Sequence, residues 1–284
     1  MSFRILAVGE VLWDMLPGGK LVGGAPGNFA YHCLQLGADA QMFSRVGNDE
    51  LGRELLDFYR SKNIPTGHFS VDPERPTGTV DVALDAGGQP KYTICENVAW
   101  DHLAAEKKTF DLAATLDAIC FGSLACRSAQ SYQTICQLVR ATPESALRVF
   151  DVNLRSPFYS ASLLADLFPL ANVLKLNDDE IKIIARMFGG PNDSLQKQAE
   201  WLLETYQYKL LILTLGANGS LLMTPGQISE YRNKPVQVVD TVGAGDAFTA
   251  GAVFGFLSGW PLDKINACAG DLAAYVCTQR GAMP

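Results

Sequence analysis

Residues 243–246, Gly-Ala-Gly-Asp, have the types and the spacing of an anion-binding site with an acid beside it. An apolar, β-branched run over 236–239 precedes them, and a run of Ala, Gly and Phe over 247–256 predicts a tightly packed helix. The two glycines let the backbone turn where a Cβ would clash, and the N–H groups of the first helical turn then point into one small volume. Asp246 could take a proton from a group that attacks the bound anion. The simpler interpretation is a helix N-cap after a glycine turn.

The rest of the chain alternates between short apolar runs and amphipathic segments, which predicts an α/β fold with a mostly parallel sheet and helices on both faces. We expect strands at 4–10, 40–46, 118–124, 147–152, 173–176 and 210–215, with 220–223 as a partner of the last one. We expect helices over 29–36, from a cap at Asn48 or Asp49 through 58, and over 128–140, 160–170, 179–188 and 195–206. The polar loops follow strands, where ligands of such sheets bind.

One region departs from this alternation. Residues 77–96 have the period of two strands with a turn at 86–88, and no helix follows to cover them. The segment 11–22 reads as an irregular hairpin. We therefore expect these two segments to project together from the main sheet as a small β lid.

Composition excludes several classes of protein. The formal net charge is −7 and no Lys/Arg-rich run is present, which argues against a nucleic-acid surface. No apolar run reaches membrane-spanning length, and no signal peptide is expected. The seven cysteines are scattered without a Cys-x-x-Cys pair, which favours reduced thiols and a cytoplasmic location. His32, His68 and His102 show no metal spacing.

Two common nucleotide motifs are missing. The segment 18–21 lacks the first glycine and the hydroxyl of a P-loop. The first strand ends in Glu10 rather than in a glycine turn, and Phe248 stands where a dinucleotide fingerprint needs its third glycine. A P-loop NTPase and a nicotinamide-dependent dehydrogenase are therefore disfavoured.

From residue 4 almost to its end, the chain resembles sugar kinases of the ribokinase, or phosphofructokinase-B, family, and among these bacterial fructokinases. Two motifs carry the resemblance: Gly-Gly-Ala-Pro-Gly-Asn-Phe-Ala at 23–30, followed by Gly37 and Gly47, and Asp-Thr-Val-Gly-Ala-Gly-Asp at 240–246. The resemblance implies one ribokinase-like domain over 1–284, with a lid formed by about 11–22 and 75–100. It also implies transfer of the γ-phosphoryl group of ATP, with Mg²⁺, to a sugar hydroxyl. Asp246 is then the base, and Gly243, Ala244 and Gly245 form the anion hole.

The resemblance also assigns residues to the sugar. Asp14 and Asn28 have side chains suited to hydroxyl groups, and Gly23 and Gly24 let the backbone approach. Without the resemblance, Asp14 reads as a turn residue and Asn28 as a helix N-cap. The stretch Asp-Val-Asn-Leu-Arg at 151–155 resembles fructokinases, so Arg155 is expected to meet the sugar or the phosphate, with a structural ion pair as the alternative. Asn97, with Trp100 and Asp101, closes the lid hairpin and is a weaker candidate.

The nucleotide and ion contacts come from four further places. Asn177 and Glu180 match an Asn-x-x-Glu motif that helps to hold Mg²⁺ and phosphate, partly through water; their plain interpretation is a helix start with acids at its positive end. The loop with Thr214, Gly216 and Gly219 resembles the nucleotide loop of the family, and Asn266 matches a position near the adenine. Asp240 and Val242, with Gly281, are expected ligands of a monovalent cation such as K⁺. The chain stops at Pro284, whereas relatives usually run on, so the sequence leaves open both the cation requirement and a truncated C-terminus.

The sequence thus predicts an ATP-dependent sugar kinase that converts D-fructose to fructose 6-phosphate and pairs with a second copy through the lid. Two alternatives stay open: a kinase for another sugar or sugar acid, such as ribose or 2-keto-3-deoxygluconate, and a catalytically silent sugar-binding relative on the same fold.

Overall fold

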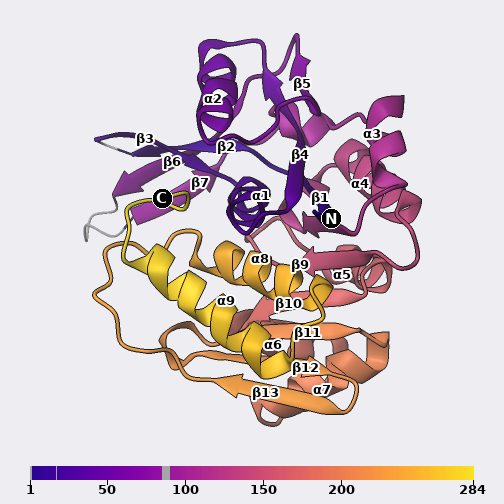
Figure 1. The fold of residues 1–284 in the computed structure, drawn as a ribbon. Helices are drawn as coiled ribbons and strands as arrows, with labels where there is room; N and C mark the ends of the chain where they lie inside the picture. Colours follow the sequence, from indigo (N-terminus) through magenta and orange to yellow (C-terminus); the bar gives the residue numbers. More distant parts are fainter. Residues whose placement is uncertain (1, 17, 85–89) are drawn as a thin grey trace.

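A computed structural model describes residues 2–16, 18–84 and 90–284, and its main element is a nine-stranded sheet within these residues (Figure 1). The strand order is β13-β12-β11-β10-β9-β8-β1-β4-β5. The bounds are β1 Arg4–Val8, β4 Asp39–Gly47, β5 Phe69–Asp72, β8 Ala118–Gly122, β9 Leu147–Asp151, β10 Val173–Asn177, β11 Leu210–Thr214, β12 Ser220–Thr224 and β13 Gln227–Tyr231. Neighbouring strands from β5 to β11 pair in parallel, and β12 and β13 add antiparallel pairs at one edge. The predicted mostly parallel sheet is confirmed.

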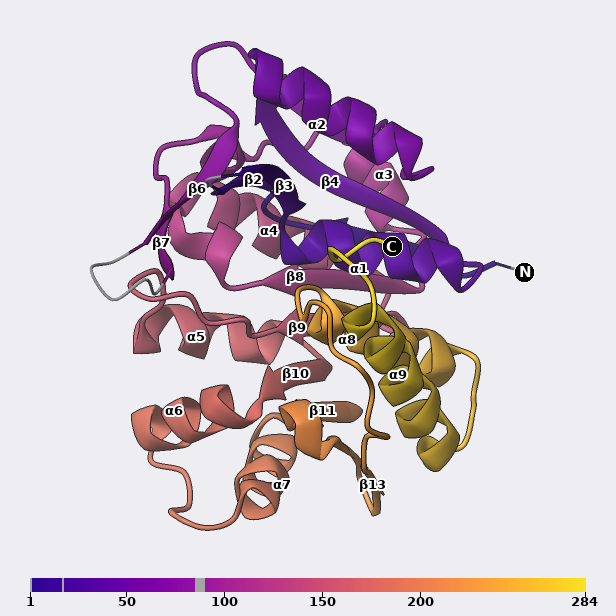
Figure 2. The same ribbon diagram turned by 90° about the vertical axis from the view of Figure 1, so that its left-hand side faces the viewer.

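Helices cover both faces of this sheet, as the two views show (Figures 1 and 2). Their bounds are α1 Ala25–Gln35, α2 Glu50–Ser61, α3 Lys107–Ala113, α4 Ala129–Ala141, α5 Ala161–Leu167, α6 Asp178–Phe188, α7 Leu195–Tyr206, α8 Ala244–Leu257 and α9 Leu262–Cys277. Side chains alternate along β1, so Ile5 and Ala7 enter one apolar cluster while Leu6 and Val8 enter the other. Helices α1, α2, α8 and α9 contribute to the first cluster, and α3 to α7 contribute to the second.

Most predicted elements are present, and the differences have local causes. Asp49 is the N-cap of α2, where its carboxylate accepts from the Gly52 N–H at 2.7 Å. The predicted helix over 160–170 ends as α5 at 167 and continues as a short 3₁₀ turn over Phe168–Leu170. The short strands β5 and β13 and helix α3 were not predicted. The valine-rich run at 236–239 has no regular secondary structure.

Helix α1 begins earlier than its sequence predicts, and this corrects the interpretation of Asn28 as an N-cap. Gly24 is the N-cap with φ 116°, a conformation that favours glycine, and a Cβ there would lie 2.6 Å from the Glu10 carbonyl oxygen. Proline is well tolerated in a first helical turn, so Pro26 belongs to the helix and does not precede it. Asn28 therefore lies inside α1, and its side chain does not cap the helix.

A second, smaller sheet confirms the predicted pairing of the two hairpins. It consists of β2 Leu12–Leu16, β3 Gly19–Gly23, β6 Gly78–Leu84 and β7 Pro90–Ile94 in the order β3-β2-β6-β7, and we call it the lid sheet. Strand β2 pairs antiparallel with β3 and parallel with β6, and β6 pairs antiparallel with β7. The turn expected at 86–88 lies outside the described residues. Figure 1 places the lid sheet beside the main sheet, near α1 and α2.

The segment after β7 belongs to the core rather than to the lid sheet, which corrects the proposed roles of Trp100 and Asp101. Both lie in a 3₁₀ turn over Ala99–His102; Trp100 is fully buried, and Asp101 forms a buried ion pair with Arg127 at 2.7 Å. The Arg127 guanidinium also lies over the Trp100 ring, 4.0 Å from its centroid. These side chains therefore fix the base of the hairpin and are not available to a sugar.

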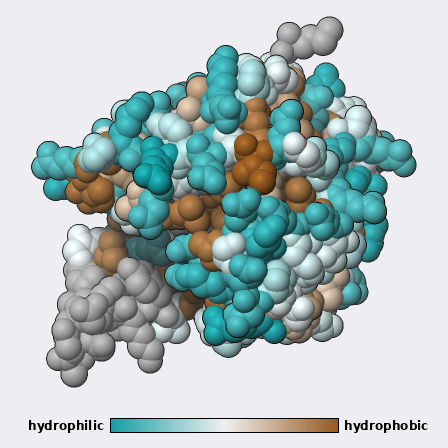
Figure 3. All heavy atoms as spheres, turned by 90° about the horizontal axis from the view of Figure 1, so that it is seen from below, coloured by the Kyte–Doolittle hydropathy of each residue, from teal (hydrophilic) through white to brown (hydrophobic). Residues whose placement is uncertain are grey.

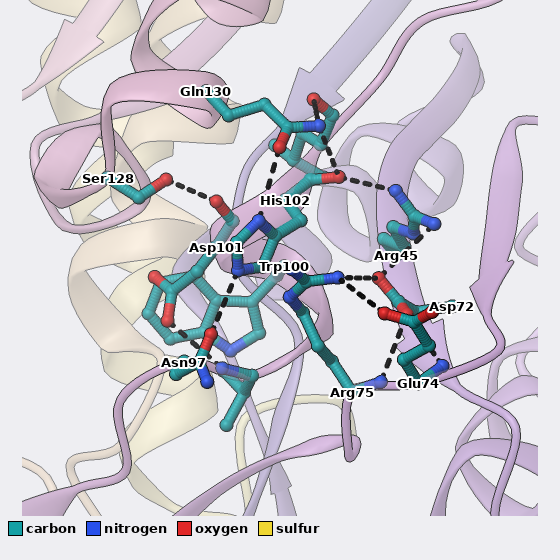
Figure 4. A network of polar contacts seen from close by, with 12 residues as sticks. Arg45, Asp72, Glu74, Arg75, Asn97, Trp100, Asp101, His102, Ser128 and Gln130 are labelled. Carbon is teal, nitrogen blue, oxygen red and sulfur yellow. Dashed lines mark hydrogen bonds and ion pairs between the residues drawn. The ribbon is translucent and has the colours of Figure 1, made fainter.

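A polar network surrounds this turn (Figure 4). The Asn97 side chain pairs with His102 Nε2 at 3.1 Å, and Gln130 pairs with His102 Nδ1 at 3.2 Å. Arg45 donates to the His102 carbonyl oxygen at 2.7 Å and forms an ion pair with Asp72 at 3.2 Å. Asn97 is thus part of the support of the lid sheet.

Hydrophilic residues cover most of the face that is seen from below, and the hydrophobic residues on it form separate groups (Figure 3). In the part of the chain that the structure covers, no helix has the length and apolar character to cross a membrane.

Candidate active site

The start of α8 has the geometry of an anion-binding helix terminus. Gly243 is its N-cap with φ 80°, and a Cβ there would lie 2.3 Å from the Ala282 Cβ, so a side chain at this position is excluded. The Ala244 N–H donates to the Thr241 carbonyl at a long 3.3 Å. The N–H groups of Gly245 and Asp246 belong to the first turn, whose usual acceptors would lie before the helix. Of the donors expected in the anion hole, these two are therefore better suited to an anion than the Ala244 N–H.

Asp246 lies beside this terminus and is joined to the other motif of the sequence. The Asn28 side-chain amide donates to Asp246 Oδ2 at 2.7 Å, across 218 residues of chain. Burial, and then the Asp151 charge, raise the pKa of Asp246 to about 6, against the lowering effects of Lys175, Asn28 and Arg155. A carboxyl with this pKa is mostly ionised at neutral pH and is a stronger base than an ordinary aspartate.

A buried ion pair lies beneath the helix terminus. Lys175 Nζ of β10 lies 3.0 Å from Asp151 Oδ1 of β9, and both side chains are 8% exposed. The Thr249 hydroxyl of α8 donates to the Gly245 carbonyl at 2.9 Å and lies 3.4 Å from Asp151 Oδ2. The ends of β9 and β10 are thereby tied to the first turns of α8.

Asn177 and Glu180 form a capping box at the start of α6. Asn177 Oδ1 accepts from the N–H groups of Asp179 and Glu180, while Glu180 Oε2 accepts from the Asn177 N–H at 2.8 Å. Glu180 Oε1 accepts from the Leu154 N–H at 2.9 Å. Burial raises the pKa of Glu180, which is 5% exposed. With both oxygens held by the backbone, Glu180 fits an outer role toward Mg²⁺, through water, better than direct ligation.

The expected sugar residues lie on β2, at the end of β3, at the N-cap and inside α1, and in the loop after β9. Gly23 lies opposite Leu12 in the β2–β3 register, and a Cβ at Gly23 would lie 2.7 Å from Asp14 Oδ2. Burial raises the pKa of Asp14, and the Arg155 charge lowers it. The Arg155 charge also lowers the pKa of Glu10 and the pKa of Asp246, so the exposed guanidinium lies near these acids. Asn97 Oδ1 pairs with His102, as described above, and a contact of Asn97 with the sugar stays a prediction.

Glu10 is a member of this group that the sequence did not predict. It follows β1, is 3% exposed, and its Oε2 has no hydrogen-bond partner among the described residues. Burial raises its pKa to about 7, although hydrogen bonds from its own N–H and from the Ala25 N–H and the Arg155 charge oppose this rise. The buried Asn28 Oδ1 likewise has no partner within the described chain. Both oxygens are buried acceptors that a hydroxyl group could satisfy.

The expected nucleotide residues lie around β11–β13. A cavity of about 530 Å³ is lined by Leu213 and Leu215, by the loop residues Ala217 and Asn218, and by the segment 230–233 among others. Thr214 and Gly216 flank this loop, and a Cβ at Gly219 would lie 1.8 Å from the Tyr231 carbonyl oxygen. Asn266 lies behind the loop and is fully buried; it accepts from the Ser220 hydroxyl and donates to the Ser229 carbonyl.

Asp240 ties the loop before α8 to the end of the chain. Its carboxylate accepts from the Val242 N–H at 3.0 Å and from the Gly281 N–H at 3.1 Å. The expected ligands of the monovalent cation are therefore adjacent, and the cation itself stays a prediction. Within the described residues, no group of three or more His, Cys, Asp and Glu side chains has the arrangement of a metal site.

Comparisons with known proteins agree with this geometry. The family described as pfkB family carbohydrate kinase matches residues 18–284. A fructokinase of Klebsiella pneumoniae is 31% identical over 301 residues, covering 100% of this chain and 96% of the relative. The crystal structure of a sugar kinase from Pyrococcus horikoshii in complex with ATP is 27% identical with a TM-score of 0.84, covering 98% of this chain and 94% of that one. A Vibrio cholerae fructokinase structure with fructose, ADP and calcium shares the fold, with a TM-score of 0.83 at 24% identity, covering 99% and 94%.

Proposed function

Because the chain belongs to the pfkB family of carbohydrate kinases, which are phosphotransferases with an alcohol group as acceptor, we propose that it transfers the γ-phosphoryl group of ATP to O6 of D-fructose. The observation that carries this proposal is the hydrogen bond from Asn28 to Asp246. It joins the motif assigned to the sugar with the motif assigned to the phosphate, so that the acceptor hydroxyl and the base share one place. The similarity to fructokinases supports the choice of sugar.

In the proposed reaction, Asp246 accepts the proton of the attacking hydroxyl, and Asn28 holds the carboxylate toward it. The N–H groups of Gly245 and Asp246, at the positive end of α8, bind the oxygens of the group being transferred. Phosphoryl transfer needs this kind of positioning and charge stabilisation more than covalent chemistry. Mg²⁺, when bound with ATP, would neutralise phosphate charge, and we assign Asn177 and Glu180 an outer role toward it, through water.

The remaining roles follow the same division. Asp14, Gly23, Gly24 and Arg155 contact the sugar, and the lid sheet closes over it to exclude water. The loop at 214–219 and the cavity beside it receive the nucleotide. The whole chain acts as one kinase domain. Its seven free cysteines support a cytoplasmic location.

A second copy is proposed to pair through the lid sheet. Leu21 lies directly opposite Asp14 in the β2–β3 register, and Leu16 follows two residues after Asp14, so both leucines share its face. They are 49% and 37% exposed. Paired lid sheets would cover this apolar surface above the two sugar sites.

The test is ADP release in a coupled assay over a panel of sugars with ATP and Mg²⁺. We expect turnover of D-fructose well above that of glucose, ribose and 2-keto-3-deoxygluconate. Phosphorus NMR of the product should show the phosphate on O6. If another sugar gives ADP release and ketohexoses give none, the sugar assignment is wrong while the family assignment stands. If no sugar on the panel is phosphorylated, the proposed reaction is refuted.

A further inference from the structure

Lys175 is a charged residue in the middle of an otherwise buried parallel strand. Strand β10 reads Val-Leu-Lys-Leu-Asn, and the other residues up to Leu176 are apolar and fully buried. A buried ammonium is costly unless its charge is paired. The parallel register sets Lys175 opposite Asp151 of β9, which supplies the paired charge.

The ammonium group lies directly against the glycine loop of the anion hole. A Cβ built on Gly245 would lie 3.3 Å from Lys175 Nζ, so a side chain at this position would crowd the ammonium. Of its three N–H donors, one reaches an acceptor among the described residues, which is Asp151 Oδ1. A pair that served only to join β9 to β10 would not need a place beneath the first turn of α8.

Several charged groups act on this ammonium. Burial lowers the pKa of Lys175, but the charges of Asp151 on β9, Glu180 on α6 and Asp246 on α8 outweigh burial and raise it. The Arg155 charge after β9 lowers the pKa of Asp246, and the charges of Asp246 and Glu10 repel each other. Cys120 on β8 stays a neutral thiol, because burial raises its pKa. Lys175 therefore remains charged and is the buried cation of a group rich in carboxylates.

We propose that Lys175 is a positioning residue of the kinase reaction: its ammonium, held by Asp151 beneath Gly245, stabilises the negative charge that the transferring group brings to the start of α8. This inference rests on the proposed phosphoryl transfer. Charges in a poorly solvated site interact strongly over several ångströms, so a fixed cation behind the loop strengthens the field of its N–H groups. It also offsets the repulsion between Asp151 and Asp246.

The test compares Lys175→Met, Asp151→Asn and the double variant, with Lys107→Met as the matched control. Lys107 also forms an ion pair with an aspartate, but on the surface of α3. We expect Lys175→Met to lower kcat by about 10²–10³-fold, the size of a lost oxyanion-hole donor. The acid limb of kcat/KM should move up by about one pH unit in Lys175→Met and down in Asp151→Asn, since one removes a cation near Asp246 and the other an anion. The control should leave kcat and the acid limb unchanged.

The double variant separates the proposed role from a structural ion pair. Removing both charges relieves the cost of an unpaired buried charge, so its melting temperature should recover toward that of the wild type. We expect kcat to stay at least about 10²-fold low, because the cation beneath Gly245 is gone. A double variant with kcat within a few-fold of wild type would overturn the inference, as would single variants with unmoved acid limbs.

A refuted role of Lys175 can be told apart from a refuted kinase reaction. The experiment uses whichever sugar gives the highest wild-type turnover, so an incorrect sugar assignment leaves it intact. The titration of Asp246 can also be followed without turnover, by NMR of protein labelled with ¹³C at the aspartate carboxyl groups, with Asp246→Asn to assign the signal. Equal midpoints for this signal in wild type and Lys175→Met would refute the inference even in a protein that phosphorylates no sugar tested.

Discussion

Replacing Asp246 with Asn should make the protein more stable while nearly abolishing its activity. The substitution keeps the size of the side chain and an oxygen that can accept from the Asn28 amide, but it removes the proton acceptor. We expect kcat to fall by about 10²–10⁴-fold, the usual range for a lost general base. Affinity for ATP should change far less, because the anion hole consists of backbone N–H groups.

The stability gain follows from the raised pKa. A shift from 3.8 to about 6 means that the fold disfavours the ionised carboxylate by roughly 3 kcal/mol. For an acid whose pKa is raised in the folded state, this destabilisation is absent below the unfolded pKa. It grows as the pH rises from the unfolded to the folded pKa, and it is complete above the folded pKa. At pH 8 the variant should therefore melt several degrees above the wild type, and at pH 4 the two should melt together.

The assay combines kcat, ATP affinity and melting temperature at pH 4, 6 and 8, with Asp111→Asn on α3 as a control for an exposed aspartate. The wild-type kcat/KM should fall on the acid side with an apparent pKa of about 6. A variant that retains near-normal kcat would refute the role of Asp246 as base. If the melting temperature of the variant, compared with that of the wild type, is lower at pH 8 than at pH 4, the proposed cost of the buried Asp246 charge is refuted.

Two further predictions concern Glu10 and the lid sheet. Glu10→Gln should raise the melting temperature at pH 8 but not at pH 4, because the pKa of Glu10 is raised to about 7 and its buried charge costs stability only above the unfolded pKa; a gain of equal size at both pH values would contradict this, as measured by differential scanning calorimetry. Leu21→Glu should convert a dimer to a monomer in analytical ultracentrifugation, since it places a charge on the exposed apolar face of the lid sheet; a wild-type protein that sediments as a monomer would remove the proposed interface.

Much of the fold could be predicted because its strands are continuous apolar runs. Buried parallel strands such as β1 and β11 need no partner to be recognised. Strand β5, with the sequence Phe-Ser-Val-Asp, and β13, with exposed polar residues, lie at the two edges of the sheet and carry too little pattern. The start of α1 was placed too late because Gly-Gly-Ala-Pro reads as a loop, although Pro26 fits a first helical turn.

The site residues that belong to a local sequence motif could be predicted. Those brought together only by the pairing of strands could not. Asp246 and Asn28 were identified from separate motifs, and the structure brings them to 2.7 Å. Lys175 is a single charged residue inside an apolar strand, and Glu10 is a charged residue directly after one; these interruptions of an apolar run are the signal that could have found them. Asp151, the partner of Lys175, lies on another strand, so the parallel pairing of β9 with β10 was needed to reveal the charged group. Asn266 matched a motif, but burial gives its amide partners inside the fold.

The separation of 218 positions between Asn28 and Asp246 bears on how the chain is made. During synthesis at about 5–20 residues per second, α1 leaves the ribosome roughly 10–40 seconds before α8 follows. Throughout that interval, one face of the main sheet lacks the two helices that complete its apolar cluster. The nascent chain therefore exposes Phe29 and its neighbours until the residues of α8 have been synthesised. Catalytic competence and protection from aggregation arrive together, when α8 docks against α1.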